Sequence, residues 1–473
     1  MDSQSRHVVE KSHLLTIPLE LILHIVSYLT TPEYGSLRAT CRHVEASLLK
    51  SFAKEFFTKR QFMITEFSLQ ALVDISKSRF ASSLTHLIIG LDRPFETQYV
   101  SGIDFERALW KCRGDEEYHS HRNLLKTCQD VEYLTEALHN LPNLETVGLR
   151  DFNSRGRYRD GGSWNSYGAP TLTSNGVTVA SVGVSPRNVN HAFLSILRAL
   201  GKTKSRGLHS VTRLEVILRH SSLSDEAFSI PRHLETDISP VLVELETLFL
   251  TLNSKTYPIL VGDETDFKAF SGFFLAQFLL GAKSLKHLRL NFTQFAREDA
   301  EDILKWLSGA PGPGRNSQTP APTAAQGMDT VMERKLQEYP SPPHFPNLEQ
   351  LDIGMLTIDR WLLLRIIERY KTSLRRISLH KVTLVILPQE IRDKVNVWHQ
   401  LFSQMDKLHL NLSAINLSCL AQYARFLAAD GFSRSRLRQI VFKGGQNRGG
   451  MESRTWSGSD IPMSSRISST LRP

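Results

Sequence analysis

The sequence predicts an α/β protein in which an N-terminal helical hairpin precedes a curved stack of parallel strands backed by helices. Two observations support this fold class. Near the start of the chain, apolar residues recur at helical spacing along two adjacent segments that together are too short to form a domain. Further on, a strand pattern of the form apolar-x-x-apolar-x-apolar recurs, usually after a segment with the period of an amphipathic helix.

The first predicted helix runs through I-P-L-E-L-I-L-H-I-V-S-Y-L, which starts at Ile17. Pro18 suits the first helical position, where a missing N–H costs nothing. Branched aliphatic residues then follow at i, i+3, i+7 and i+10, so one face is apolar throughout. That face consists of Leu19, Ile22, Val26 and Leu29, widened by Leu21 and Ile25.

A second helix is predicted after Thr31 and Pro32, which end the first helix and begin the next. Its apolar residues also fall on one line at helical intervals. The members of this line are Tyr34, Leu37, Cys41, Val44 and Leu48. A hairpin of this size with an uninterrupted apolar face needs a partner.

The two helices resemble the F-box, whose pattern is an apolar residue and Pro, then Glu, apolar pairs, an aromatic-Leu ending, and a second helix with Leu-Arg and Cys-Arg. The matching positions are Ile17, Pro18, Glu20, Leu21, Ile22, Ile25, Val26, Tyr28, Leu29, Leu37, Arg38, Cys41 and Arg42. The continuation E-F-F-T-K-R-Q-F is similar to F-box proteins of filamentous fungi. Three positions depart from the pattern, with Tyr34 for Leu, Thr40 for an apolar residue and Val44 for a bulky aromatic one.

The resemblance implies docking onto a Skp-type adaptor and, through it, a cullin. The chain would then be a substrate receptor in a ubiquitin ligase, and an unknown protein would be its target. The residues expected to contact the adaptor are Ile17, Pro18, Leu19, Ile22, Ile25, Val26, Leu29, Leu37, Cys41 and Val44. The alternative is a protein-interaction scaffold without a role in ubiquitin transfer, in which the hairpin only caps the next domain.

The strand pattern predicts an irregular leucine-rich-repeat solenoid. Strand plus helix in each unit is the organisation of such repeats, although these units are longer and less even than usual. The copies begin at Leu84, Leu144, Val211, Leu245, Leu285, Leu348, Leu374, Met405 and Leu437. A stack of this kind presents a strand-lined concave face, where we expect the target to bind. A doubly wound sheet would give a similar pattern and is the alternative.

Composition divides the chain into four parts. Two segments rich in Gly, Ser, Asn or Pro are predicted to be loop insertions, because their composition does not support a packed core. The parts are a flexible N-terminus at 1–12, the F-box hairpin at 13–60, a repeat domain at 61–443 with insertions at about 151–188 and 309–346, and a flexible basic tail at 444–473.

The sequence contains no recognisable catalytic motif, so we expect a non-catalytic protein with no cofactor and no metal. Nucleotide-binding, esterase and zinc-protease signatures are all missing from it. Cys112, His119, His121 and Cys128 have a spacing that is not typical of zinc fingers. An enzyme with its site on the loops is the weakest alternative, because His220, Asp225 and Glu226 form no known constellation.

Charge and targeting signals indicate a cytoplasmic or nuclear protein that is not secreted. The formal net charge is +9, and between Gly431 and Pro473 eight Lys or Arg residues stand against two acidic ones. A solvated tail explains this charge, and no aromatic RNA motif indicates a nucleic-acid partner. The four cysteines show no CxxC spacing, which favours reduced thiols. The sequence shows neither a secretory segment nor an apolar run of about 20 residues. We therefore expect neither export nor a membrane span.

Overall fold

The computed structural model describes residues 16–95, 105–155, 159, 163–180, 184–207, 211–253, 257–261, 264–268, 272–296, 301–310, 340–386, 396–427, 433–440, 453–457 and 467. The chain forms two compact units. Unit 1 comprises Met1–Leu144 and Phe152–Ser181, and unit 2 comprises Glu145–Asp151 and Val182–Pro473. The predicted flexible segment 1–12 lies outside the described residues.

Unit 1 begins with three helices rather than the predicted two. They are α1 (Leu19–Val26), α2 (Thr31–Ala39) and α3 (Arg42–Phe56). The predicted second helix is interrupted at Cys41, whose φ of −158° and ψ of 161° are extended. At the start of α2, the Thr30 N–H donates to Glu33 Oε2 at 2.8 Å in a capping box. The apolar line predicted for one helix therefore continues across two.

The rest of unit 1 is built around a parallel pair of strands, β1 (Lys59–Met63) and β2 (His86–Gly90). Helices and short strands complete it, including two antiparallel pairs, β3 with β7 and β5 with β6. Their bounds are α4 (Glu66–Ser76), η2 (Ala81–Ser83), β3 (Arg93–Pro94), α5 (Phe105–Lys126), α6 (Gln129–His139), β5 (Ser154–Arg155), β6 (Ser163–Trp164), α7 (Ala169–Ser174) and β7 (Val179–Ala180).

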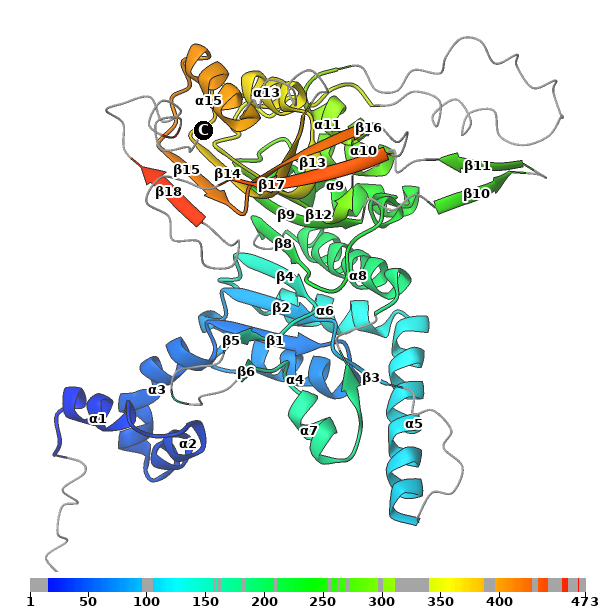
Figure 1. Cartoon of the computed structure of the whole chain (residues 1–473). Helices are drawn as coiled ribbons and strands as arrows, with labels where there is room; N and C mark the ends of the chain where they lie inside the picture. Colours follow the sequence, from blue (N-terminus) through cyan, green and yellow to red (C-terminus); the bar gives the residue numbers. More distant parts are fainter. Residues whose placement is uncertain are drawn as a thin grey trace, which may run out of the picture. The chain divides into compact units, whose positions relative to one another are not determined.

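Unit 2 is a largely parallel sheet whose strands lie side by side in chain order, β4-β8-β9-β12-β13-β14-β15 (Figure 1). A helical segment follows each strand before the next begins. The elements are β4 (Thr146–Arg150), α8 (Pro186–Lys204), β8 (Arg213–Ile217), η4 (Asp225–Phe228), α9 (Arg232–Glu244), β9 (Thr247–Asn253), α10 (Phe273–Gly281), β12 (His287–Ala296), α11 (Glu301–Leu307), β13 (Gln350–Ile358), α13 (Arg360–Arg369), β14 (Arg376–Ile386), α15 (Val397–Lys407) and β15 (Ala414–Ser418).

Short strands complete unit 2. A separate antiparallel pair lies between β9 and α10, and three further strands follow β15 in the chain. These strands are β10 (Tyr257–Val261), β11 (Glu264–Lys268), β16 (Ala421–Leu427), β17 (Ser433–Gln439) and β18 (Ser453–Ser457). β18 runs antiparallel to β15. The segment predicted as a flexible basic tail, 444–473, therefore contributes a strand to the sheet.

The order of the strands separates unit 2 from a doubly wound sheet. In a doubly wound sheet the strand order reverses at a switch point, whereas here each parallel strand is added beside the preceding one. Successive helices also pack on one another, from α8 through α9, α10, α11 and α13 to α15. The helices therefore form one layer that follows the sheet.

The apolar residues of the strand pattern form the core of unit 2. In three neighbouring strands, Leu248, Leu288 and Leu351 share one register row and are at most 1 % exposed. Side chains on alternate positions point to the opposite face of the sheet. That face carries polar and charged side chains, among them Arg289 and Asp352.

One of the nine predicted strand copies is wrong, and a second is a strand that does not belong to the parallel series. The copy at Met405 lies at the end of α15, where Met405 is buried as part of a helix. The copy at Leu437 lies on β17, which pairs antiparallel with β16 and does not extend the parallel series. The strand that follows β14 in the parallel series is instead β15, which the sequence L-S-A-I-N-L from Leu412 fits equally well. β16 also runs parallel to β14, along the second half of that strand.

Candidate functional site

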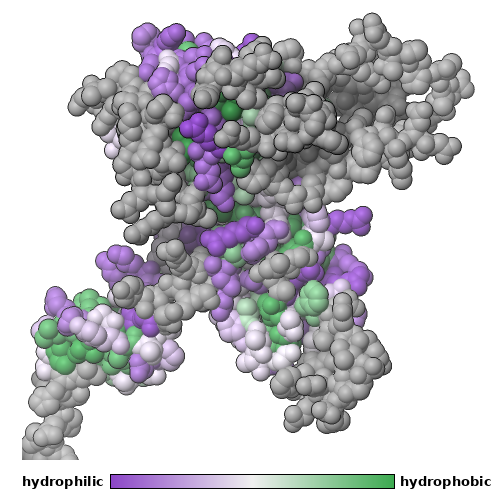
Figure 2. Space-filling model, viewed as in Figure 1, coloured by the Kyte–Doolittle hydropathy of each residue, from purple (hydrophilic) through white to green (hydrophobic). Residues whose placement is uncertain are grey.

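The outer side of α1 is a continuous apolar surface. Four large apolar side chains on or next to this helix are exposed, namely Leu19 (43 %), Leu21 (55 %), Ile25 (45 %) and Tyr28 (77 %). Leu21, Ile25 and Tyr28 stand at i, i+4 and i+7 and so form one stripe. We call Leu21, Ile25 and Tyr28 the α1 face; Leu19, in the first turn, lies on the helix side of Ile22 and Val26. Figure 2 shows hydrophobic residues gathered on the helical module in this part of unit 1.

The inner side of α1 holds the helix in place. Ile22 and Val26 are 2 % exposed and belong to a core cluster with Tyr34, Val44 and Phe56. Since α1 is apolar on both sides, one side completes the core of the three helices and the other side faces outwards. The arrangement therefore leaves apolar area uncovered on a short helix, which is typical of a docking element.

The structure divides the predicted adaptor-binding residues into three groups. Ile22, Val26 and Val44 are buried in the core of the three helices, so their side chains do not reach a surface in this conformation. The exposed residues are Pro18, Leu19 and Ile25, and the partly buried residues that pack against the core are Ile17, Leu29, Leu37 and Cys41.

Two exposed residues of the α1 face, Leu21 and Tyr28, were absent from the predicted contacts. They match the F-box pattern, but the prediction followed the line through Ile22 and Val26, which turned out to face inwards. The i, i+4, i+7 spacing of Leu21, Ile25 and Tyr28 was the signal that would have found them.

Two of the three departures from the F-box pattern, Tyr34 and Val44, lie in the same core. Tyr34 is fully buried, and its ring lies 5.3 Å from that of Phe52 and 5.8 Å from that of Phe56, both edge to face. Val44, which is also fully buried, belongs to the same cluster. A large residue at position 34 and a small one at position 44 thus fill the shared core without the usual aromatic at 44.

A basic residue also packs on this core. The Arg38 guanidinium lies 3.6 Å from the centre of the Phe52 ring and pairs with Glu45 at 2.9 Å. Arg79, which follows α4, pairs with the same carboxylate. These two arginines, Arg79 first, lower the pKa of Glu45 by hydrogen bonding to its carboxylate. The N-terminal end of α3 is thereby linked to the segment that follows α4.

The three helices form a short module with a core of its own and an uncovered apolar face, which is typical of a protein-docking element. Among protein families, the F-box domain matches residues 14–47. The chain therefore carries an F-box domain that spans α1, α2 and the start of α3. No curated protein matches the chain.

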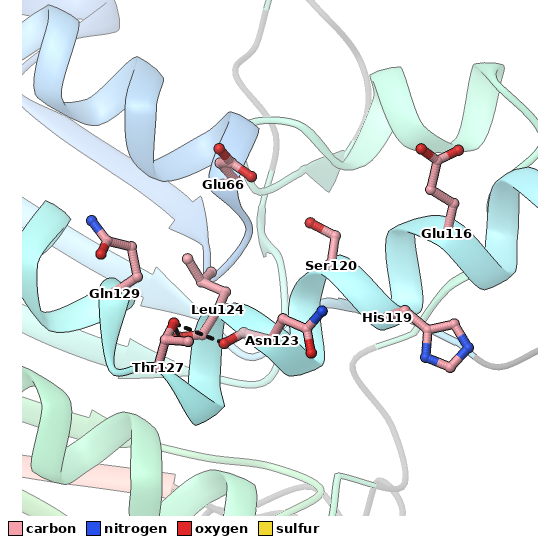
Figure 3. Close-up of a pocket in the computed structure, with 8 residues that line it drawn as sticks. All are labelled: Glu66, Glu116, His119, Ser120, Asn123, Leu124, Thr127 and Gln129. Atoms are coloured by element: carbon pink, nitrogen blue, oxygen red, sulfur yellow. Dashed lines mark hydrogen bonds between the residues drawn. The ribbon is translucent and has the colours of Figure 1, made fainter.

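A pocket of about 470 Å³ lies in unit 1 beside α5 and the start of α4 (Figure 3). Glu66, Glu116 and His119 are among its lining residues, and Figure 3 shows Glu116 and His119 pointing in different directions. Burial is the main cause that raises the pKa of the neighbouring Glu117. Glu116 and His119 therefore do not form an acid–base pair across this pocket.

The other sequence candidates have structural contacts in the described part of the chain. The His121 ring nitrogen Nδ1 lies 2.7 Å from the Ile64 carbonyl, and the side chain of Cys112 lies outside the described residues. Asp225 accepts the N–H of Leu275 at 2.9 Å at the start of α10. Where the structure describes side chains, no three potential ligands cluster as for a metal ion. None of the described helices has the length and hydropathy of a membrane span.

Proposed function

We propose that this chain is the substrate-receptor subunit of a Skp/cullin/F-box ubiquitin ligase. The F-box domain at residues 14–47 supports this role, because such domains bind Skp-type adaptors within cullin complexes. The observation that carries the proposal is the exposed α1 face. The protein performs no bond chemistry and acts in the cytoplasm or nucleus. It raises the effective concentration of a target near the ubiquitin-charged enzyme.

The α1 face is the proposed centre of the adaptor contact. Interfaces gain most of their affinity from a few large apolar or aromatic residues that become fully buried. Leu21, Ile25 and Tyr28 meet this description, because all three are exposed and lie on one stripe. Ile22, Val26 and Val44 contribute indirectly, because they hold α1 on α2 and α3.

Unit 2 is the proposed target-binding part, as an irregular leucine-rich-repeat solenoid. The strand order and the single helix layer support this architecture. We place the target on the strand face that carries Arg289 and Asp352. Asp352 is 3 % exposed and accepts hydrogen bonds from Arg289 at 2.7 Å and from His287 at 2.9 Å. The Arg289 guanidinium also lies 4.3 Å from the centre of the Phe249 ring.

This arrangement prepares the strand face for recognition. Contacts from Asp352 and Phe249 hold the Arg289 side chain, which remains 33 % exposed. Less side-chain entropy is therefore lost when a partner binds. Arginine and aromatic residues are also enriched among the residues that dominate protein interfaces.

The test replaces exposed residues of the α1 face. We expect the variant Leu21→Asp/Ile25→Asp to lose adaptor binding by about 100-fold or more, because two charges would be buried in an apolar contact. Both positions are exposed, so the hairpin should stay folded. Affinity for a purified Skp-type adaptor gives the readout.

The matched control is Val243→Asp/Trp361→Asp, which places the same charges at exposed apolar positions of α9 and α13. We expect this control to bind the adaptor as the unmodified chain does. Protein partners held by unit 2 should remain with both variants. Undiminished adaptor binding by Leu21→Asp/Ile25→Asp contradicts the proposal.

A further inference from the structure

The segment predicted as the first loop insertion contains a hairpin that belongs to unit 1. β5 pairs antiparallel with β6, and Arg159 lies midway between them in the sequence. Unit 1 includes this whole excursion, Phe152–Ser181, although the strand that precedes it belongs to unit 2. The excursion therefore returns the chain to the unit that contains the F-box helices.

The stem of this hairpin is fixed to β1. Gln61 donates from Nε2 to Ser166 Oγ at 2.9 Å, and its carbonyl accepts the Tyr167 N–H at 2.8 Å. Ser166 also hydrogen-bonds Asp92, and both residues are buried. A Cβ at Gly90 would lie 2.3 Å from Ser166 Oγ, so only glycine permits this approach. Buried polar contacts of this kind hold the stem in one position.

Arg159, midway between β5 and β6, reaches the end of α1. Its Nη1 donates to the carbonyls of Val26 at 2.7 Å and Leu29 at 2.6 Å. Val26 is the last residue of α1 and Leu29 lies in the turn that follows it, so the guanidinium sits at the C-terminal end of the helix, where a cation is favoured. No lysine could place donors on both carbonyls and still form a bidentate pair.

The other side of the same guanidinium pairs with α3. Nε donates to Glu55 Oε1 at 2.6 Å and Nη2 donates to Glu55 Oε2 at 2.8 Å, so the pair is bidentate. The Arg159 side chain is 9 % exposed, whereas that of Glu55 is 30 % exposed. The guanidinium lies 5.0 Å from the centre of the Tyr34 ring in α2. One side chain thus contacts all three helices.

We infer that Arg159 is a positioning residue for adaptor docking, which locks α1 against α2 and α3 so that the α1 face is presented as one fixed surface. Helix α1 has 8 residues, and a helix of this length is not stable without tertiary contacts. Its inner side supplies Ile22 and Val26, and Arg159 secures its C-terminal end. Tyr34, which departs from the F-box pattern, is the aromatic residue beneath this arginine.

The inference rests on the proposed function, and two separate readouts keep them distinguishable. The first is hydrogen exchange of residues 17–57 in the full chain without any partner. The second is the affinity for a purified Skp-type adaptor. We compare Arg159→Ala, Arg159→Lys, Glu55→Gln and the double variant Glu55→Gln/Arg159→Ala. The control is Lys77→Ala, which removes an exposed ion pair with Glu136 from the same unit.

For Arg159→Ala we expect exchange in α1 to be at least about tenfold faster and adaptor binding to weaken by a similar factor. Arg159→Lys should restore little of the protection of α1 or of the adaptor affinity, since lysine lacks the planar, forked set of donors of a guanidinium. Glu55→Gln should add little in the Arg159→Ala background, because residues of one network are not additive. Lys77→Ala should change neither readout.

Two results would overturn the inference. One is unchanged exchange in α1 of Arg159→Ala, and the other is full additivity of the two substitutions, which would indicate a general loss of stability. A third result separates the two proposals. If the unmodified chain does not bind the adaptor but Arg159→Ala still accelerates exchange in α1, Arg159 holds α1 in place and the proposed function is wrong.

Discussion

The F-box helices and the repeat strands of unit 2 use the same aliphatic residues in opposite ways. In unit 2, Leu248, Leu288 and Leu351 lie on three neighbouring strands and are at most 1 % exposed. The side chains at alternate positions of these strands, on the opposite face, are polar or charged more often than apolar. In α1, Ile22 is 2 % exposed and Ile25, one turn further on, is 45 % exposed. Apolar spacing alone thus locates an element, but only burial shows whether it forms a core or a docking surface.

The largest expected effect compares two aromatic residues, one from each region. Phe292 in β12 is fully buried, and Phe292→Ala should lower the free energy of unfolding of unit 2 by about 3–5 kcal/mol. Tyr28→Ala should change stability by less than about 0.5 kcal/mol, because Tyr28 is 77 % exposed. Denaturant unfolding of both variants measures this difference, and equal effects would break the comparison.

A second prediction compares two isoleucines of the same helix. Ile22→Ala should destabilise the F-box helices by about 2–5 kcal/mol, because it opens a cavity among Tyr34, Val44 and Phe56. Ile25→Ala should leave their stability unchanged and weaken adaptor binding by about 1–2 kcal/mol. Hydrogen exchange of α1 and adaptor affinity separate the two effects. Loss of protection in both variants would contradict the assignment of two faces.

The smallest expected effect is a pH dependence of opposite sign in the two regions. Burial raises the pKa of Asp225 in unit 2 to about 6 from 3.8. The folded state therefore binds this proton more tightly than the unfolded state. As the pH rises from about 4 to 6, the free energy of unfolding of unit 2 should fall by about 1–3 kcal/mol.

In the F-box domain the sign is reversed. Hydrogen bonds from Thr30, first from its backbone, lower the pKa of Glu33 at the start of α2. Glu33 therefore stabilises the folded F-box domain fully above about pH 4.5, the ordinary pKa of a glutamate. This stabilisation is lost as the pH falls through the lowered pKa of the folded state. Unfolding curves of each region between pH 3 and 7, with Asp225→Asn and Glu33→Gln as controls, measure both slopes. If the stability of unit 2 still falls with rising pH in the Asp225→Asn variant, the pH dependence is not caused by Asp225.

The strand pattern predicted most of the parallel strands because it records a local rule. Residues that alternate between a buried and an exposed face give the same pattern in every copy, from Leu84 to Leu374. The rule failed at Met405, where Trp398, Leu401 and Phe402 share a helix face with Met405. A short apolar run at a helix end fits both periods, so spacing could not decide between them.

The F-box site was predictable in type but not in detail. The motif located α1, whereas the division between Ile22 inside and Ile25 outside depends on how α1 packs on Tyr34 and Phe56. Arg159 had no local signal at all, because Glu55 is 104 residues away in the sequence. Contacts of this range depend on the whole fold, and the composition of 151–188 indicated only a loop.

The antiparallel strand β18 covers β15 and takes its place as the edge strand on this side of the sheet of unit 2. It runs along β15 and pairs all five residues from Ala414 to Ser418. A sheet edge with unpaired N–H and C=O groups is a template for another strand. A chain truncated before Ser453 would expose the edge of β15, and copies of it would then associate through their sheets into larger particles.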